Sequence, residues 1–124
     1  MVSGHDPEFI SAIAAAENRR IAAHRQFLAQ RREALRAEAL RLVPLLIECD
    51  PGIERIRLFG SVLPRRRFRS DSDLDLAVEG ATRFSDLRRI VDVSDWVVDL
   101  IEWETLSESI QKIVARDAEV LFDS

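Results

Sequence analysis

The sequence predicts an α/β (α+β) domain in which helices flank a small mixed β-sheet. Its first third is rich in Ala, Arg, Glu and Leu and has no glycine between Gly4 and Gly52, which is typical of long helix. After Gly52, short apolar runs alternate with stretches of helical spacing, and turn residues separate them. The predicted order is helix, strand, strand, helix, strand, helix, strand, and one sheet covered by helices accommodates it.

The first helix is predicted to begin at Asp6-Pro7-Glu8, where Asp6 can cap, Pro7 suits the first helical position and Glu8 faces the positive end of the dipole. We expect a break near residues 24–32 and a kink or an end at Pro44. Apolar residues recur at three-to-four-residue spacing or its multiples: Phe9, Ile13, Ile21, Leu28, Leu35 and Leu42.

Residues 1–33 are predicted to form a helical extension, and residues 34–124 the domain proper. The extension is longer than the domain requires. An exposed amphipathic helix often binds a partner, but it can equally pack back on its own sheet, and the pattern favours neither alternative.

The strands are predicted from apolar runs bounded by turn signals. The first follows the turn at Cys49–Gly52 and has Arg55 and Arg57 alternating outward. The predicted elements after the turn are strand Ile53–Phe59, strand Leu74–Val78 ending at Gly80, helix Phe84–Val91, strand Trp96–Ile101, helix Leu106–Val114 and strand Val120–Phe122.

Composition narrows the class of protein. With 124 residues, 47% of them hydrophobic, the chain can bury one core. A net charge of -4 gives no general reason to expect DNA or RNA as a partner.

Cys49 is the only cysteine, which fits a reducing compartment. No apolar run approaches the roughly 20 residues of a membrane helix, and the first ten residues do not resemble a signal peptide. We therefore expect a cytoplasmic protein.

Two carboxylates stand out in Ser72-Asp73-Leu74-Asp75-Leu76. On a strand, Asp73 and Asp75 share one face while the two leucines share the other. When two carboxylates lie this close together, either the pKa of one of them rises or a cation binds between them. Mg²⁺ prefers carboxylate ligands together with phosphate oxygens and water. The alternative is an acidic, solvent-facing strand, and this motif alone does not decide between the two.

A third carboxylate, Asp99, interrupts an otherwise apolar strand. A buried, unpaired carboxylate is costly, so Asp99 needs a partner or must lie at an exposed strand edge. If its strand neighbours the strand of Asp75, the third carboxylate joins the other two. Taken alone, a salt bridge or partial exposure explains Asp99 better than a metal does.

Gly60-Ser61 directly follows the first predicted strand. Glycine permits a close approach of backbone to ligand, a helix beginning there would present free N–H groups to an anion, and Ser61 adds a hydroxyl. Arg65, Arg66, Arg67 and Arg69 come next and could contact phosphates. Individually, each feature is more often an ordinary turn or a solvated loop.

In this order the motifs resemble the nucleotidyltransferase superfamily that includes DNA polymerase β. More narrowly, residues 34–122 resemble the minimal nucleotidyltransferase family, the antitoxin partners of HEPN-type toxins. The resemblance implies that Gly60 and Ser61 bind the triphosphate of a nucleotide, with Arg65 and Arg66 as further candidates. It also implies that three residues bind Mg²⁺ and take part in catalysis: Asp73, Asp75 and Asp99. Among them, Asp99 would help to deprotonate the attacking hydroxyl.

The implied reaction is transfer of AMP from ATP to a hydroxyl of a partner protein, a HEPN-type toxin, with release of pyrophosphate. The sequence departs from the family pattern in two ways, so its contacts with the phosphates can differ from those of the family. Eleven residues, not ten, separate Ser61 from Asp73, and Leu63-Pro64-Arg65-Arg66 replaces the usual Ala-Arg-Gly. The alternatives are an antitoxin that neutralises by contact alone and transfer to a small molecule. A homo-oligomer is a further possibility.

Overall fold

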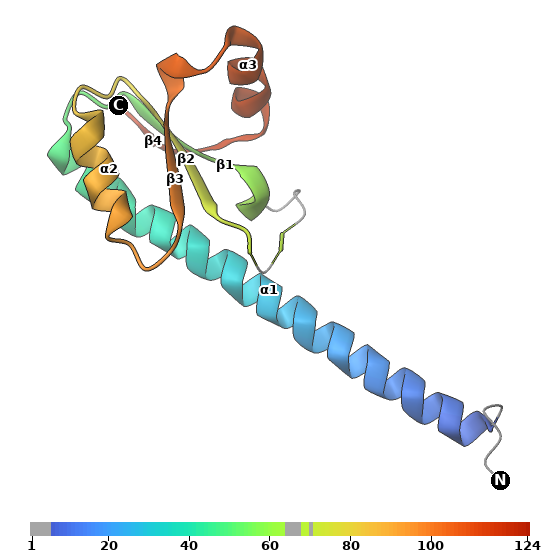
Figure 1. The fold of residues 1–124 in the computed structure, drawn as a ribbon. Coiled ribbons are helices and arrows are strands. Elements are labelled where there is room, and N and C mark those ends of the chain that lie inside the picture. The colour runs from blue at the N-terminus through green and yellow to red at the C-terminus, as the bar shows by residue number, and fades with distance from the viewer. Residues whose placement is uncertain (1–5, 64–67, 70) are drawn as a thin grey trace.

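The computed structural model describes residues 6–63, 68–69 and 71–124. Its centre is a four-stranded sheet in the order β3-β2-β1-β4 (Figure 1). The elements follow the predicted order, with two short 3₁₀ turns in addition: α1 (Pro7–Cys49), β1 (Arg55–Phe59), η1 (Gly60–Val62), β2 (Leu74–Glu79), α2 (Phe84–Asp92), β3 (Val98–Glu102), η2 (Trp103–Thr105), α3 (Glu108–Asp117) and β4 (Glu119–Asp123).

Helix α1 begins as predicted, since the Asp6 carboxylate accepts a hydrogen bond from the Glu8 N–H at 2.9 Å. It then continues for 43 residues, so the break expected near residues 24–32 is wrong. That stretch contains no Gly or Pro, and its Ala, Arg, Gln and Leu residues are good helix formers. Pro44 does not end the helix either. The carbonyl that loses its N–H partner belongs to Leu40, which lies half-exposed at the surface.

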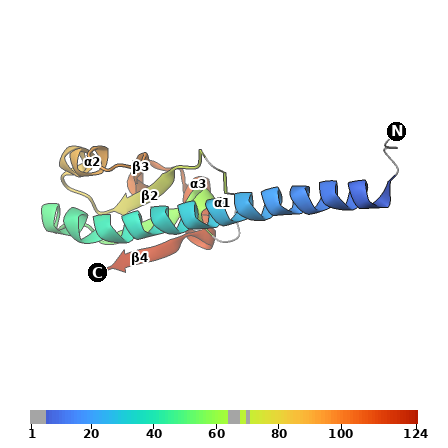
Figure 2. The ribbon, with the colours of Figure 1, turned by 90° about the horizontal axis from the view of Figure 1, so that it is seen from below.

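Only the C-terminal part of α1 belongs to the core. Its buried apolar residues lie one helical turn apart and pack on the sheet: Leu35, Ala39, Leu42 and Leu46. The N-terminal part projects beyond the sheet as a straight helix, seen from two directions in Figure 1 and Figure 2.

The two faces of the sheet differ in character. Ile56 and Leu58 of β1, together with Leu76 and Val78 of β2, are fully buried on the face covered by α1 and α2. The alternation of side chains along a strand sends their neighbours to the opposite face. That second face carries Arg57, Asp75 and Ala77.

Arg57 is not exposed, contrary to the prediction that it points outward to solvent. It does lie on the face away from α1, but only 7% of its surface is accessible. Its guanidinium carbon lies 3.7 Å from the centroid of the Trp103 ring, and Nη1 lies 3.5 Å from a Glu79 carboxylate oxygen. The sequence does not show that the η2 turn places an aromatic ring over this arginine.

Asp50, at the C-terminal end of α1, links the turn that follows this helix to the segment that leads into α2. Its buried carboxylate accepts hydrogen bonds from the N–H of Gly52 (3.1 Å), the N–H and hydroxyl of Thr82 (2.7 Å each) and the N–H of Arg83 (2.8 Å). Burial alone would raise the pKa of Asp50, but these hydrogen bonds together hold it below the ordinary value. The carboxylate fixes where the chain leaves α1 and where it enters α2.

In the described part of the chain, no helix combines the length and the apolar content that a membrane crossing requires.

Candidate functional site

The strand register brings the predicted site residues to one end of the sheet. β1 runs antiparallel to β2, and Phe59 pairs with Asp75. β2 runs parallel to β3, and Asp75 pairs with Asp99. The last residue of β1 and two carboxylates therefore form one row across three strands. Gly60-Ser61 follows that row directly, and Asp73 lies just before β2, two residues from Asp75.

The three carboxylates differ in their exposure. Asp75, on the inner strand β2, is half-buried, whereas Asp73 and Asp99 are exposed to solvent. β3 is an edge strand, so the acid in its apolar run is explained by the exposed edge, one of the two alternatives that the sequence left open. Asp99 nevertheless stands beside Asp75, because the parallel register pairs them.

Gly60 lies directly against Asp75. Its φ is +83°, a left-handed conformation that favours glycine. A Cβ added at this position would lie 2.2 Å from the Asp75 carboxylate oxygen Oδ2, well inside van der Waals contact. The sequence suggested that glycine lets the backbone approach a ligand. In the structure, its absent side chain makes room for the central carboxylate.

The electrostatics of Asp75 indicate an unbalanced negative site. Burial, and then the neighbouring charges of Asp99 and Asp73, raise the pKa of Asp75 from 3.8 to about 6. A bound cation would reverse this shift, because it lowers the energy of the ionised carboxylates. Oxygen-only ligands of this kind fit Mg²⁺. Among the described residues, however, no three acidic, histidine or cysteine side chains already stand close enough to enclose a metal ion.

A cavity of about 370 Å³ adjoins Gly60 on the side of α3. Most of its wall is apolar, and one carboxylate lies at its edge. The lining residues are Phe59, Gly60, Ser61, Leu63, Ile113, Val114 and Asp117. Sequence reasoning missed the three residues from α3, because the spacing of Ile113 and Val114 reads as that of a helix packed in the core. In fact, no residue of α3 is fully buried.

The chain continues from Gly60 as a single 3₁₀ turn, Gly60–Val62. A helix beginning there could have presented free N–H groups to an anion, and in the described residues only this short turn stands in its place. Arg65 and Arg66, the predicted phosphate-binding arginines, lie outside the described residues. Further along, Phe68 is buried, and the guanidinium of Arg32 in α1 lies 5.2 Å from the centre of its ring. This contact fixes the chain at Phe68 against α1, a few residues before Asp73.

The contact between Gly60 and Asp75 gives a direct prediction. Gly60→Ala should reduce activity at this site by at least about 100-fold, because the added methyl group must displace the Asp75 carboxylate. The strain at positive φ should cost about 1–2 kcal/mol of the free energy of unfolding. Both effects can be read from a steady-state assay and a urea titration on the same preparation.

Gly80→Ala is the matched control. Gly80 also has a positive φ, +82°, but its added Cβ would meet the backbone oxygen of Gly52 and not a site residue. It should lose stability while it keeps its turnover number. Equal loss of activity in the two variants would contradict a specific role for the contact between Gly60 and Asp75.

The mixed four-stranded sheet with its three helices has a nucleotidyltransferase-like fold, and solved toxin–antitoxin structures are similar to it. A mutant of the toxin–antitoxin MntA–HepT is 22% identical, with a TM-score of 0.54 and coverage of 68% of this chain and 73% of that chain. A toxin–antitoxin with AMP-PNP is 24% identical, with the same TM-score and coverage. The toxin–antitoxin MntA–HepT is 22% identical, covers 68% and 70%, and has a TM-score of 0.50. No protein family matches the chain by sequence, and no curated protein is significantly similar to it.

Proposed function

We propose that the chain is a Mg²⁺-dependent nucleotidyltransferase of the minimal nucleotidyltransferase family. In this proposal it transfers AMP from ATP to a hydroxyl of a HEPN-type toxin and acts as the antitoxin of the pair. The observation that carries the proposal is the row Phe59–Asp75–Asp99 beside Gly60, with the pKa of Asp75 raised to about 6. The solved structures of the same fold, one of them with AMP-PNP, support the choice of a nucleotide.

Asp73, Asp75 and Asp99 would hold the metal. Their carboxylate oxygens are the ligands that Mg²⁺ takes, and the raised pKa of Asp75 supports a site in which a cation is required to balance the charge. When bound, Mg²⁺ neutralises charge on the phosphates and polarises the bond that breaks.

The nucleotide would lie between the cavity and the carboxylates. The apolar wall from Phe59 to Val114 suits a nucleoside, and Gly60-Ser61, at the edge of the cavity nearest Asp75, can offer N–H groups and a hydroxyl to the phosphates. In this arrangement the α-phosphate would lie near the row of carboxylates. Positioning of this kind accounts for much of the rate in phosphoryl and nucleotidyl transfer.

Asp99 is the residue best placed to meet an incoming hydroxyl, because it is exposed on an edge strand that a partner protein can approach. In the proposed reaction, the acceptor oxygen forms a bond to the α-phosphorus while the bond from this phosphorus to the bridging oxygen breaks. Pyrophosphate leaves, and the hydroxyl proton passes to the Asp99 carboxylate.

The proposal can be tested with α-labelled ATP, Mg²⁺ and the protein encoded beside this gene. We expect label on that protein, and none when Asp73→Asn and Asp75→Asn are combined. A wild-type preparation that binds ATP but transfers no label would contradict the proposed activity. If the folded double variant still neutralised the toxin in cells, contact alone would be the mechanism of the antitoxin.

A further inference from the structure

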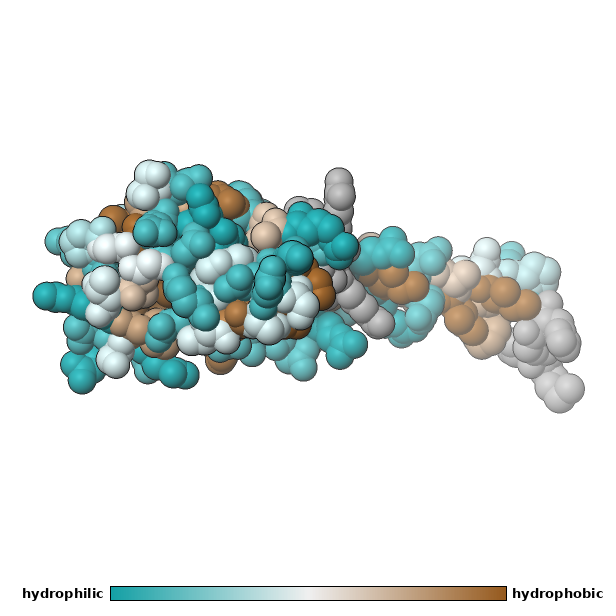
Figure 3. All heavy atoms as spheres, turned by 90° about the horizontal axis from the view of Figure 1, so that it is seen from above, coloured by the Kyte–Doolittle hydropathy of each residue, from teal (hydrophilic) through white to brown (hydrophobic). Residues whose placement is uncertain are grey.

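The projecting part of α1, residues 7–27, carries large apolar side chains that meet nothing else in the described chain. We call this segment the N-terminal arm. Five of its apolar residues have between 42% and 52% of their surface exposed: Phe9, Ile10, Ile13, Ile21 and Phe27. Figure 3 shows apolar surface along the arm, interrupted by hydrophilic side chains.

These five residues lie on one side of the helix. At 100° per residue they fall within an arc of about 120°. Leu28 falls within the same arc, as do the core residues Leu35 and Leu42. The apolar stripe of the arm therefore continues the stripe by which α1 packs on the sheet. A helix gains most of its stability in proteins from packing such a face, and here nothing in the described chain covers it.

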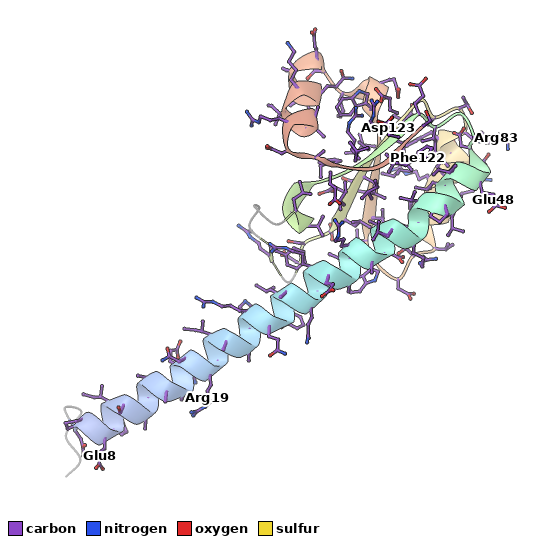
Figure 4. The ribbon with its side chains drawn as sticks, turned by 180° about the vertical axis from the view of Figure 1, so that it is seen from behind. Glu8, Arg19, Glu48, Arg83, Phe122 and Asp123 are labelled. Atoms are coloured by element: carbon purple, nitrogen blue, oxygen red, sulfur yellow. The ribbon has the colours of Figure 1, made fainter. Side chains whose placement is uncertain are left out.

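The charges of the arm are divided along its length. Its beginning is acidic, with Asp6 just before it and Glu8 and Glu17 within it, and the following stretch is basic, with Arg19, Arg20 and Arg25. Figure 4 places Glu8 near the tip and Arg19 further along the same projecting helix. A second arm laid parallel would set acid beside acid and base beside base. A second arm laid antiparallel can instead bring Glu17 of each copy to the basic stretch of the other.

We propose that two copies of this chain associate through their N-terminal arms, which pair antiparallel along the apolar stripe. A crossing centred near residues 20 and 21 brings Ile13 of each copy close to Leu28 of the other. The same crossing places Glu17 of each copy near His24 of the other, and both of these side chains lie within the stripe. Between residues 13 and 28 the arm thus supplies both the apolar and the charged groups that match those of a second copy.

The first test is the mass of the full chain in solution, measured by light scattering at about 50 μM. We expect a dimer for the wild type and a monomer for Ile13→Glu, which places a charge in the stripe. Because the arm lies outside the core, Ile13→Glu should keep the wild-type thermal transition of the domain. Ser11→Glu is the matched control, since Ser11 lies away from the stripe, and it should stay dimeric.

Charge reversal tests the complementarity. A basic-arm variant (Glu17→Arg) and an acidic-arm variant (Arg19→Glu with Arg25→Glu) should each be monomeric alone and form a heterodimer when mixed. A spin label at Ser11→Cys, in a Cys49→Ser background, tests the direction. The two labels should be roughly 30 Å apart in an antiparallel pair and no more than about 15 Å apart in a parallel pair.

Three results would overturn the proposal: a monomeric wild type at this concentration, a dimer that Ile13→Glu leaves intact, or the short label distance. A monomer whose arm becomes protected from proteolysis only when the toxin is added would identify the toxin as the occupant instead. None of these measurements depends on nucleotide transfer.

Discussion

Asp75→Asn should abolish nucleotide transfer and at the same time make the metal-free protein more stable. Loss of the central carboxylate should lower activity by at least about 10³-fold, since a neutral amide is a poor ligand for Mg²⁺. The gain in stability has a separate cause. The pKa of Asp75 is raised to about 6 by burial and by the charges of Asp99 and Asp73, so ionised Asp75 destabilises the fold. We expect a gain of about 1–2 kcal/mol in the free energy of unfolding at neutral pH, because solvent screens part of the repulsion.

The sign of the effect gives its pH dependence. A carboxyl group whose folded pKa is raised supports the fold fully below its unfolded value of 3.8, and that support is lost as the pH rises through about 6. The difference in stability between Asp75→Asn and the wild type should therefore be near zero at about pH 4 and reach its maximum above about pH 7. Urea titrations in EDTA at several pH values measure this difference.

Asp71→Asn is the control, because Asp71 is an exposed acid near the same site. It should change the free energy of unfolding by less than about 0.5 kcal/mol. Added Mg²⁺ should stabilise the wild type and not Asp75→Asn. A variant that is no more stable than the wild type in EDTA would contradict the mutual repulsion of the three carboxylates.

Asp50→Ala should be the most destabilising substitution considered for this chain, although Asp50 takes no part in the proposed chemistry. It would leave the N–H groups of Gly52, Thr82 and Arg83 and the Thr82 hydroxyl without their acceptor. Because Asp50 is fully buried, water cannot readily replace the carboxylate. We expect a loss of about 3–5 kcal/mol in the free energy of unfolding, measured by urea titration.

Asp50→Asn should fall between the wild type and Asp50→Ala, because one amide oxygen remains while the NH₂ group faces donors. Asp92→Asn, at an exposed position at the end of α2, is the control and should be near neutral. The pKa of Asp50 is held below its ordinary value, so its contribution should be complete above about pH 4 and disappear as the pH falls further. A loss below about 1 kcal/mol for Asp50→Ala would contradict its role in joining the turn after α1 to the start of α2.

Local patterns were sufficient to predict the order of the elements. Asp6-Pro7-Glu8 predicted the start of α1, and alternating or helically spaced apolar residues predicted each later helix and strand to within a few residues. The expected break in α1 is wrong, because residues 24–32 contain neither Gly nor Pro and consist largely of good helix formers.

The contacts of the site depend on pairings between distant segments, which local patterns do not contain. The register that sets Asp75 beside both Phe59 and Asp99 follows from strand order. The same holds for the contact of Gly60 with Asp75 and for the approach of α3 to Gly60-Ser61. The sequence identified Asp73, Asp75 and Asp99 as candidates, and their role as metal ligands stays a prediction.

The continuity of α1 determines how the two copies would be spaced. The docked part and the arm are turns of one helix with no linker or hinge between them, so the helix acts as a rigid strut. With arms crossing near residues 20 and 21 and α1 contacting its own domain from Leu28 onward, the two points where the domains begin would lie roughly 22 Å apart along the paired helices. Two copies joined in this way would keep a fixed spacing and a fixed relative orientation.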